Sequence, residues 1–217
     1  MQPLSQIRRE YSQGHLTEGS LLSDPYLQFN LWMGDAVEAG LPDPTAMTVA
    51  SVNDQGQPSQ RIVLLKDVIG GDFVFYTNLG SRKAQDIMSN SKVSLHFPWH
   101  ILERQVHVRG TASLVPRDAV QKYFSSRPIS SQLAAWTSKQ SQPIDSREAL
   151  LARFEETKNT FSNKDIPAPE FWGGFKVTPQ EIEFWQGGDH RLHDRFVFSR
   201  NVSHENSANW SVQRLMP

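Results

Sequence analysis

The feature that most constrains the fold is a series of short β-rich segments separated by turn signals. Between residues 46 and 115 the turn-forming runs include residues 53–56 and 70–72. The β-rich segments are MTVASV, QRIVLLKDVI, DFVFYTN, KVSLHF and RQVHVRGTASLV. Strands joined by short turns pair antiparallel, whereas a parallel doubly wound sheet needs a helix between successive strands. The pattern therefore predicts an antiparallel meander.

The rest of the chain adds helices and a second group of strands. Helical spacing and capping signals predict helices at Pro25 to Ala39, Ser81 to Met88, Arg117 to Ser125, Ser131 to Ser138 and Ser146 to Phe161. FWGGFKVT, IEFWQ, HRLHDRFVFSR and NWSVQRL read as further strands. About eight strands with intercalated helices predict a mainly β fold with helices (α+β), a closed or split β-barrel. We expect a mobile arm over residues 1–24 and a single domain over 25–217.

Composition narrows the classes of function. With 217 residues and 38% hydrophobic content, the chain can build one sizeable core, and no apolar run is long enough to span a membrane. The start of the chain is charged and cysteine is absent, so we expect a cytoplasmic protein without an export signal or disulfides. Without thiolates, any redox chemistry needs a borrowed cofactor. The net charge of −1 argues against nucleic acid as a partner.

The segment WQGGDHRLHDR, residues 185–195, is the richest in chemically active side chains. Read as a turn at Gly187-Gly188 followed by a strand, it places Arg191, His193 and Arg195 on one face. Such groups repel one another unless an anion lies across them, which indicates an anionic small molecule. The alternative is that these three residues lie on the solvent-exposed face of an edge strand. The alternation of side chains along a strand, taken alone, slightly favours this alternative. Its two histidines lie three residues apart, but no third ligand is suitably spaced beside them, so we expect no metal site.

Two helix starts are candidate phosphate sites. Ser81 is expected to cap a helix whose first turn carries Arg82 and Lys83, and cations there oppose the helix dipole unless an anion is bound. The second start follows Tyr123 and Arg127, where Pro128 ends one helix and Ser130 or Ser131 caps the next. The alternatives are an exposed Arg-Lys pair and an ordinary helix-kink-helix corner.

Two strand segments carry weaker signals. Arg61 and Lys66 bracket the apolar run RIVLLK, but strand parity puts them on opposite faces, so a shared ligand would require a bulge or a strand end. In RQVHVRG, Gln105, His107 and Arg109 share a face. The Gln105 amide, which has two donors and an acceptor, could form hydrogen bonds with the edge of a planar heterocycle. A polar outer face is the alternative.

Several motifs together resemble one family. RIVLLK, FYTNLGSRKA, LERQV, YFSSRP, SKQS, FWGGF and WQGGDHRLHDR occur in the order and at the spacing typical of the pyridoxamine 5'-phosphate oxidase family, from Arg8 to Pro217. The resemblance implies an FMN-binding split barrel that works as a homodimer with FMN at the interface. It also implies that pyridoxamine 5'-phosphate and pyridoxine 5'-phosphate are oxidised to pyridoxal 5'-phosphate, with molecular oxygen as acceptor and hydrogen peroxide as product.

The resemblance also implies roles for individual residues. The FMN contacts would be Arg61, Ile62, Val63, Leu64, Leu65, Lys66, Tyr76, Thr77, Arg82, Lys83, Gln105, Gln140, Ser141, Trp185 and Arg195. The substrate contacts would be Arg8, Tyr11, Lys66, Tyr123, Arg127, Ser131, Arg191, Leu192 and His193. Arg191 and His193 would be catalytic, with Arg191 orienting the substrate and His193 as the better general base. Both ends of RIVLLK would face flavin, which predicts irregular strand geometry near Lys66.

Three further expectations come with the resemblance. The N-terminal arm, with Arg8 and Tyr11, would cover the site. The polar loop from Asn201 to Ala208 is longer than is typical of the family. The rival functions are a non-catalytic flavin or pyridoxal-phosphate carrier, which would lack the substrate contacts, and a nucleic-acid-binding barrel, which would need a basic stripe with interleaved aromatics.

Overall fold

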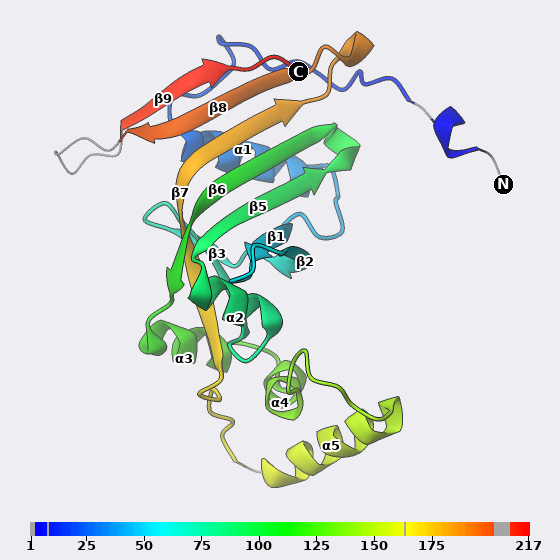
Figure 1. Ribbon diagram of the computed structural model, residues 1–217, viewed down its shortest axis with the longest axis vertical. Coiled ribbons are helices and arrows are strands. Elements are labelled where there is room, and N and C mark those ends of the chain that lie inside the picture. Colours follow the sequence, from blue (N-terminus) through cyan, green and yellow to red (C-terminus); the bar gives the residue numbers. More distant parts are fainter. Residues whose placement is uncertain (1–2, 8, 163, 202–208) are drawn as a thin grey trace. The chain divides into compact units, whose positions relative to one another are not determined.

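The computed structural model describes residues 3–7, 9–162, 164–201 and 209–217 (Figure 1). Its strands are β1 (Ala46–Val52), β2 (Pro58–Leu64), β3 (Asp67–Ile69), β4 (Asp72–Asn78), β5 (Lys92–Trp99), β6 (Arg104–Leu114), β7 (Trp172–Gln186), β8 (Asp194–Asn201) and β9 (Asn209–Arg214). Its α-helices are α1 (Pro25–Glu38), α2 (Arg82–Ser89), α3 (Arg117–Ser125), α4 (Ile129–Thr137) and α5 (Arg147–Thr160). Short 3-10 helices are η1 (Leu4–Gln6), η2 (His100–Leu102) and η3 (Asp189–Arg191). The prediction of a mainly β protein with helices is confirmed.

The strands form one sheet in the order β2-β1-β5-β6-β7-β4-β3, with β8 paired to β7 and β9 to β8. The pairs β3–β4, β4–β7, β7–β8 and β8–β9 are antiparallel. A simple meander is therefore only partly right. Strands β2 and β3 are consecutive in sequence yet stand at opposite ends of the order, because the chain leaves the sheet at Leu65 and Lys66 before it enters β3.

The chain divides into two compact units. The first unit comprises Met1–Val49, Ser94–Gly110 and Pro179–Pro217. Its core is aromatic: Phe29 and Trp32 of α1 are buried with Phe97 of β5 and Phe184 of β7. Helix α1 starts as predicted at Pro25, after an Asp24 cap that accepts two backbone hydrogen bonds.

The second unit comprises Ala50–Val93 and Thr111–Thr178. Val120 and Phe124 of α3 pack with Trp172 of β7 in one buried cluster. Trp136 on α4 contacts Phe161 just after α5, and the hydroxyls of Thr137 and Thr157 join the same two helices. Among the described residues, no helix is both long enough and apolar enough to cross a membrane.

Three predicted strands have different bounds in the structure. QRIVLLKDVI is two strands, because residues 65 and 66 leave the ladder, and the irregular geometry expected near Lys66 is confirmed. FWGGFKVT and IEFWQ are one strand, β7, whose ladder to β4 ends at Val177 and whose ladder to β8 starts at Glu181. Pro179, which lacks an N–H, falls in the gap between these two ladders, so it does not break the strand.

The glycines of FWGGF let aromatic side chains pack closely against β7. A Cβ at Gly174 would lie 2.7 Å from the Tyr76 ring and 2.8 Å from the Phe75 carbonyl oxygen. A Cβ at Gly173 would lie 2.9 Å from the Leu79 side chain. Backbone cannot yield as a flexible side chain can, so the stricter requirement is at Gly174.

We expect Gly174→Ala to lower the free energy of unfolding by about 1 to 3 kcal/mol, because the added methyl group overpacks the site. The matched control is Gly34→Ala, on an exposed turn of α1 with nothing within 4 Å of its added Cβ. Alanine there should instead stabilise the protein by about 1 kcal/mol. Urea denaturation of the two variants measures both effects, and equal stabilities would contradict the packing argument.

Candidate functional site

The second unit contains a cavity of about 850 Å³ with a strongly cationic lining. Its wall is formed by Arg61, Ile62, Val63, Leu64, Lys66, Tyr76, Thr77, Asn78, Arg82, Lys83, Tyr123, Arg127, Ser131, Ala134, Ala135, Ser138, Gln140, Ser141 and Trp172. Five of these side chains are Lys or Arg, and none of the described lining residues is acidic. A cavity with this charge favours an anionic ligand.

Helix α2 starts at the wall of this cavity. Ser81 occupies the N-cap position, as predicted, but its hydroxyl donates to the Asn78 carbonyl at 2.7 Å and caps no helical N–H. The expected side-chain cap is therefore wrong, because the tight turn after β4 takes the hydroxyl. The Arg82 N–H donates to the Ser141 hydroxyl at 3.3 Å. The helix start is thus held by the 138–141 loop and keeps a cationic first turn.

Lys83 is a buried cation with neutral partners. Its ammonium donates to Thr77 Oγ1 at 2.9 Å, Gln140 Oε1 at 2.9 Å and Ser81 Oγ at 3.3 Å. Burial, and secondarily the charge of Arg61, lower the pKa of Lys83 to about 8. A bound anion would offset both effects, so the charge on Lys83 favours an anion at this wall.

Arg61 is oriented by a network that the sequence did not reveal. Its guanidinium donates to Ser51 at 2.8 Å and to Ser59 at 2.6 Å, and both hydroxyls donate to the buried carboxylate of Asp86, at 2.9 and 3.1 Å. Burial lowers the pKa of Arg61, and Asp86 partly opposes this. Asp86 on α2 therefore holds the arginine through two serines. The sequence held one indication of this network, because Asp86 is the single acidic residue of α2 and lies on its buried face.

Three aromatic rings lie parallel along the cavity wall. Tyr76 stacks on Tyr123 with ring centroids 4.0 Å apart, and the Trp172 ring lies nearly parallel to both, with its centroid 5.4 Å from that of Tyr76 and 6.1 Å from that of Tyr123. Burial raises the pKa of both tyrosines, so their hydroxyls stay protonated donors at neutral pH. The three rings come from β4, α3 and β7 and form one aromatic group in the cavity lining. Sequence reasoning missed Trp172, although FWGGF contains it.

Arg127, between α3 and α4, lies with its guanidinium 4.7 Å from the Trp172 ring centroid and 5.5 Å from that of Phe124. One nitrogen, Nη1, is buried and has no hydrogen-bond partner among the described residues. Burial lowers the pKa of Arg127. A buried guanidinium nitrogen without a partner is costly, and a phosphate oxygen would satisfy it.

Ser131 lines the same cavity, but not as a helix cap. Helix α4 starts at Ile129 with Pro128 at the N-cap position, so the predicted start at Ser131 is two residues late. Proline needs no partner for an N–H, and its φ of −52° suits this position. The Ser131 N–H already donates to the Pro128 carbonyl. The groups that remain available to a ligand here are the Ser131 hydroxyl and the backbone of the surrounding turn.

The first unit holds a second cluster of predicted residues. Tyr11 contacts Trp185 and His193 edge-on, with centroids 5.9 and 5.3 Å apart, and Trp185 lies 4.6 Å from His193. The Arg191 guanidinium lies 5.7 Å from the Tyr11 ring. The Gly188 N–H donates to His193 Nδ1 at 3.1 Å. Partial burial and the charge of Arg191 lower the pKa of His193, so the ring is neutral at pH 7.

The predicted strand over residues 190–200 is wrong at its start. Residues Asp189–Arg191 form η3, with left-handed φ angles of 55° at His190 and 66° at Arg191, and β8 begins at Asp194. The Leu192 N–H closes this turn on the Asp189 carbonyl. Arg191, His193 and Arg195 therefore do not share a strand face. Arg195 lies within β8 and pairs with Glu183 at 2.7 Å.

Gln105 on β6 lies between two histidines. Its Oε1 is 3.2 Å from Nε2 of both His96 and His107, whose rings stack at 4.4 Å. Burial lowers the pKa of both imidazoles, and their mutual repulsion adds to the shift of His107. Arg109, which follows Gln105 and His107 in the alternation along β6, pairs with Glu181 at 3.0 Å.

The structure thus separates the predicted residues into two groups. The second unit brings together, around one cavity, all those from Arg61 to Ser141 except Leu65, which is buried outside the lining, and Gln105. The first unit holds Tyr11, Gln105, Trp185, Arg191, Leu192, His193 and Arg195. Arg8 and residues 202–208 of the long polar loop lie outside the described residues.

Comparison with known proteins agrees with this architecture. Residues 33–161 match the model for pyridoxamine 5'-phosphate oxidase, and residues 172–217 match that for the pyridoxine 5'-phosphate oxidase C-terminal dimerisation region. The chain is 82% identical over the full length of both proteins to a pyridoxine/pyridoxamine 5'-phosphate oxidase of Pseudoalteromonas atlantica. It is 58% identical, over 99% of both chains, to the protein of that name from Vibrio atlanticus.

Solved structures share the fold. The crystal structure of PhzG from Burkholderia lata superposes with a TM-score of 0.85 at 24% identity, covering 93% of this chain and 98% of that one. An FMN-binding protein from Nostoc punctiforme gives 0.72 at 15% identity, covering 89% and 98%. Sheet and cavity define a split-barrel protein with a cationic ligand site. The family models and full-length relatives place it more narrowly: the chain belongs to the pyridoxamine 5'-phosphate oxidase family.

The lowered pKa of Lys83 predicts the pH dependence of anion binding. The folded value of about 8 lies below the ordinary value of 10.5, so between these the unfolded chain binds more protons and Lys83 makes ligand-free stability rise with pH. Anions bind the protonated form. Sulfate should therefore stabilise the protein more at about pH 6.5 than at about pH 9.5, because sulfate itself does not titrate there.

Thermal unfolding in sulfate and in chloride at equal ionic strength measures this effect. Lys83→Met should show a smaller difference between the two pH values, because it carries no titrating charge at the cavity wall. A pH dependence that is the same in Lys83→Met and in the unsubstituted protein would contradict the role of Lys83.

Proposed function

We propose that this chain is an FMN-dependent oxidase that converts pyridoxamine 5'-phosphate and pyridoxine 5'-phosphate to pyridoxal 5'-phosphate. The observation that carries the proposal is the presence of two cationic walls at two different helix starts of one cavity. One is built from Arg82 and Lys83 at α2, and the other from Arg127 and Ser131 at α3 and α4. Two phosphate esters, one from a flavin and one from a substrate, match two such walls.

The residues around α2 fit an FMN phosphate. Arg61, Arg82 and Lys83 supply charge, and Thr77, Gln140 and Ser141 are hydrogen-bonding groups on the same wall. The apolar run from Ile62 to Leu64 lines the cavity beside them, which suits a planar ring system. When bound, FMN supplies the redox chemistry: a hydride equivalent leaves the substrate C4', and molecular oxygen is reduced to hydrogen peroxide.

The residues around α3 and α4 fit the substrate phosphate. The unpartnered Arg127 nitrogen, the Tyr123 hydroxyl and the Ser131 hydroxyl would bind it, with Lys66 adding charge. Atoms balance for both substrates: the alcohol loses two hydrogens to oxygen, whereas the amine also consumes water and releases ammonia. A carrier of flavin alone would have no use for this second wall.

Arg191 and His193 are the proposed catalytic pair. Arg191 stays protonated, so it orients the substrate and stabilises negative charge. His193 is neutral, and because Nδ1 accepts the Gly188 N–H, its proton is on Nε2. In this conformation His193 therefore presents a donor. It acts as a general base once Gly188 releases Nδ1.

The proposed assembly is a cytoplasmic homodimer with FMN at the subunit interface. A match to a dimerisation region over residues 172–217 supports the dimer, and the absence of cysteine suits a reducing compartment. We propose one split-barrel domain over residues 25–217, preceded by an N-terminal arm that covers the site. Nucleic acid and membrane are not among the proposed partners.

The direct test is oxygen uptake. The purified protein, after FMN is added and excess flavin removed, should be yellow. It should consume one oxygen and release one hydrogen peroxide per pyridoxine 5'-phosphate oxidised. A protein that retains flavin but never turns over either substrate would be a carrier. A colourless protein that stays inert in excess FMN would refute the proposal outright.

Substitutions in the two walls should affect different quantities, substrate binding at one wall and flavin binding at the other. Arg127→Ala should raise the KM for pyridoxine 5'-phosphate by roughly 30-fold or more while flavin retention stays close to that of the unsubstituted protein, because a charged hydrogen bond to phosphate is lost. Arg61→Ala should instead weaken FMN binding. Arg153→Ala, exposed on α5, is the control and should change neither quantity. Flavin loss in Arg127→Ala with normal turnover after reconstitution would contradict the assignment.

A further inference from the structure

Glu103 combines two unfavourable features in one residue. It lies between η2 and β6 with a left-handed φ of 53°, and only 4% of it is exposed. A glutamate gains nothing from left-handed backbone, and a buried carboxylate is costly unless strong donors satisfy it. The residue therefore has a local task that a glycine or an apolar side chain could not perform.

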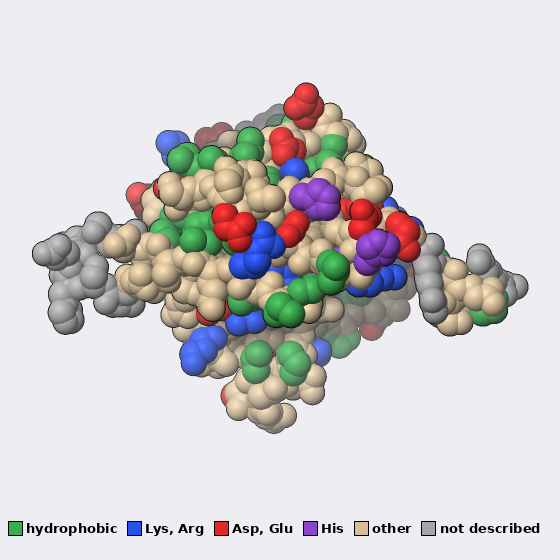
Figure 2. Space-filling view, turned by 90° about the horizontal axis from the view of Figure 1, so that it is seen from above, with side chains coloured by type: hydrophobic (Ala, Val, Ile, Leu, Met, Phe, Trp, Pro, Cys, Tyr) green, Lys and Arg blue, Asp and Glu red, His purple; other side chains and the backbone are tan. Residues whose placement is uncertain are grey.

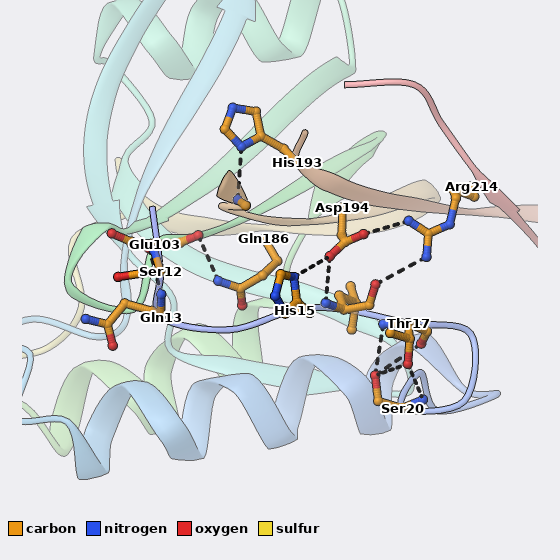
Figure 3. A network of polar contacts seen from close by, with 12 residues as sticks. Ser12, Gln13, His15, Thr17, Ser20, Glu103, Gln186, His193, Asp194 and Arg214 are labelled. Carbon is orange, nitrogen blue, oxygen red and sulfur yellow. Dashed lines mark hydrogen bonds and ion pairs between the residues drawn. The ribbon is translucent and has the colours of Figure 1, made fainter. Parts of the chain in front are cut away.

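The donors come from the N-terminal segment, whose backbone Figure 3 shows next to the Glu103 carboxylate. Oε2 accepts the Ser12 N–H at 2.8 Å and the Gln13 N–H at 3.0 Å. Oε1 lies 3.6 Å from the Arg9 guanidinium. One carboxylate thus fixes two successive backbone amides with charge-assisted bonds, which are stronger than neutral ones.

The backbone of Glu103 binds a second segment, the turn at Gly187. Its carbonyl accepts the Gly187 N–H at 2.7 Å. Gly187 in turn has Tyr11 packed against it, since a Cβ there would lie 2.6 Å from the Tyr11 ring and 3.1 Å from the Glu103 Cβ. Glu103 therefore binds both the segment that carries Tyr11 and the turn that leads to His193.

A separate anchor lies further along the segment. Asp194 pairs with Arg214 at 2.6 Å (Figure 3). Asp194 also accepts the Leu16 N–H at 3.0 Å, and Arg214 also pairs with Glu18. This second anchor would keep the segment attached if Glu103 were changed. A substitution at Glu103 should then release residues 9–13 locally without detaching the segment.

We propose that Glu103 is a positioning residue, whose carboxylate clamps residues 11–13 so that the Tyr11 ring packs edge-on against Trp185 and His193. The role rests on the proposed function, in which Tyr11 and His193 contact substrate. In this role Glu103 itself would contact neither substrate nor cofactor. It acts through Tyr11, which covers one edge of the imidazole and limits the positions that a substrate ring can take.

Hydrogen exchange in the FMN-loaded protein tests the clamp without using activity. Asparagine tolerates left-handed backbone better than most residues, so Glu103→Asn keeps the turn but shortens the side chain away from the two amides. The Ser12 and Gln13 amides should then exchange about tenfold faster or more, with Leu16 unchanged. Glu103→Gln, which keeps an acceptor but no charge, should lie between. Glu10→Asn, exposed in the same segment, is the matched control.

Ligand binding tests what the clamp does. Glu103→Asn should raise the KM for pyridoxine 5'-phosphate, and the Kd for pyridoxal 5'-phosphate, by about tenfold with little loss of kcat or flavin. In a Tyr11→Ala background the same substitution should add almost nothing. Unchanged exchange at Ser12 and Gln13, or additive effects in the double variant, would overturn the proposal. If the unsubstituted protein proves inactive, the proposed function fails, while exchange and Kd still decide the role of Glu103.

Discussion

The interaction on which the site depends is the burial of cations beside neutral partners. Lys83 has three hydrogen-bond acceptors but no carboxylate within ion-pair distance among the described residues, and Arg127 has one buried nitrogen without a partner. Folding buries the Lys83 ammonium and this one nitrogen of Arg127 without giving either group a carboxylate partner among the described residues. The free energy lost in this way is recovered when an anion enters, so ligand affinity and reduced ligand-free stability have the same origin.

Sequence patterns predicted most of the fold because they report local physics. Turn residues and alternating apolar positions located the strands, and the helices starting at Pro25 and Arg117 begin where predicted. The errors occurred where tertiary context overrides local preference. Pro179 reads as a strand break, yet it lies between two ladders, and no pattern along the chain reveals which strand lies opposite.

The site was predicted unevenly for a related reason. Residue types at helix starts, such as Arg82 and Lys83, indicate an anion by themselves. The network through Asp86 could not be predicted in the same way, because Ser51, Ser59 and Asp86 meet only in the fold. In the 185–195 segment, strand parity failed at His190 and Arg191, whose left-handed backbone replaces a strand with a turn.

The contrast between the two units gives the strongest argument about charge. In the first unit several arginines have carboxylate partners: Arg104 pairs with Asp35, Arg195 with Glu183, and Arg214 with Asp194 and Glu18. Figure 2 shows acidic and basic side chains next to one another on one face. The cavity lining has basic side chains without acids. A chain with a net charge of −1 has enough carboxylates to pair cations such as Lys83 and Arg127, so a shortage of acids does not explain why these two side chains have no carboxylate partner among the described residues.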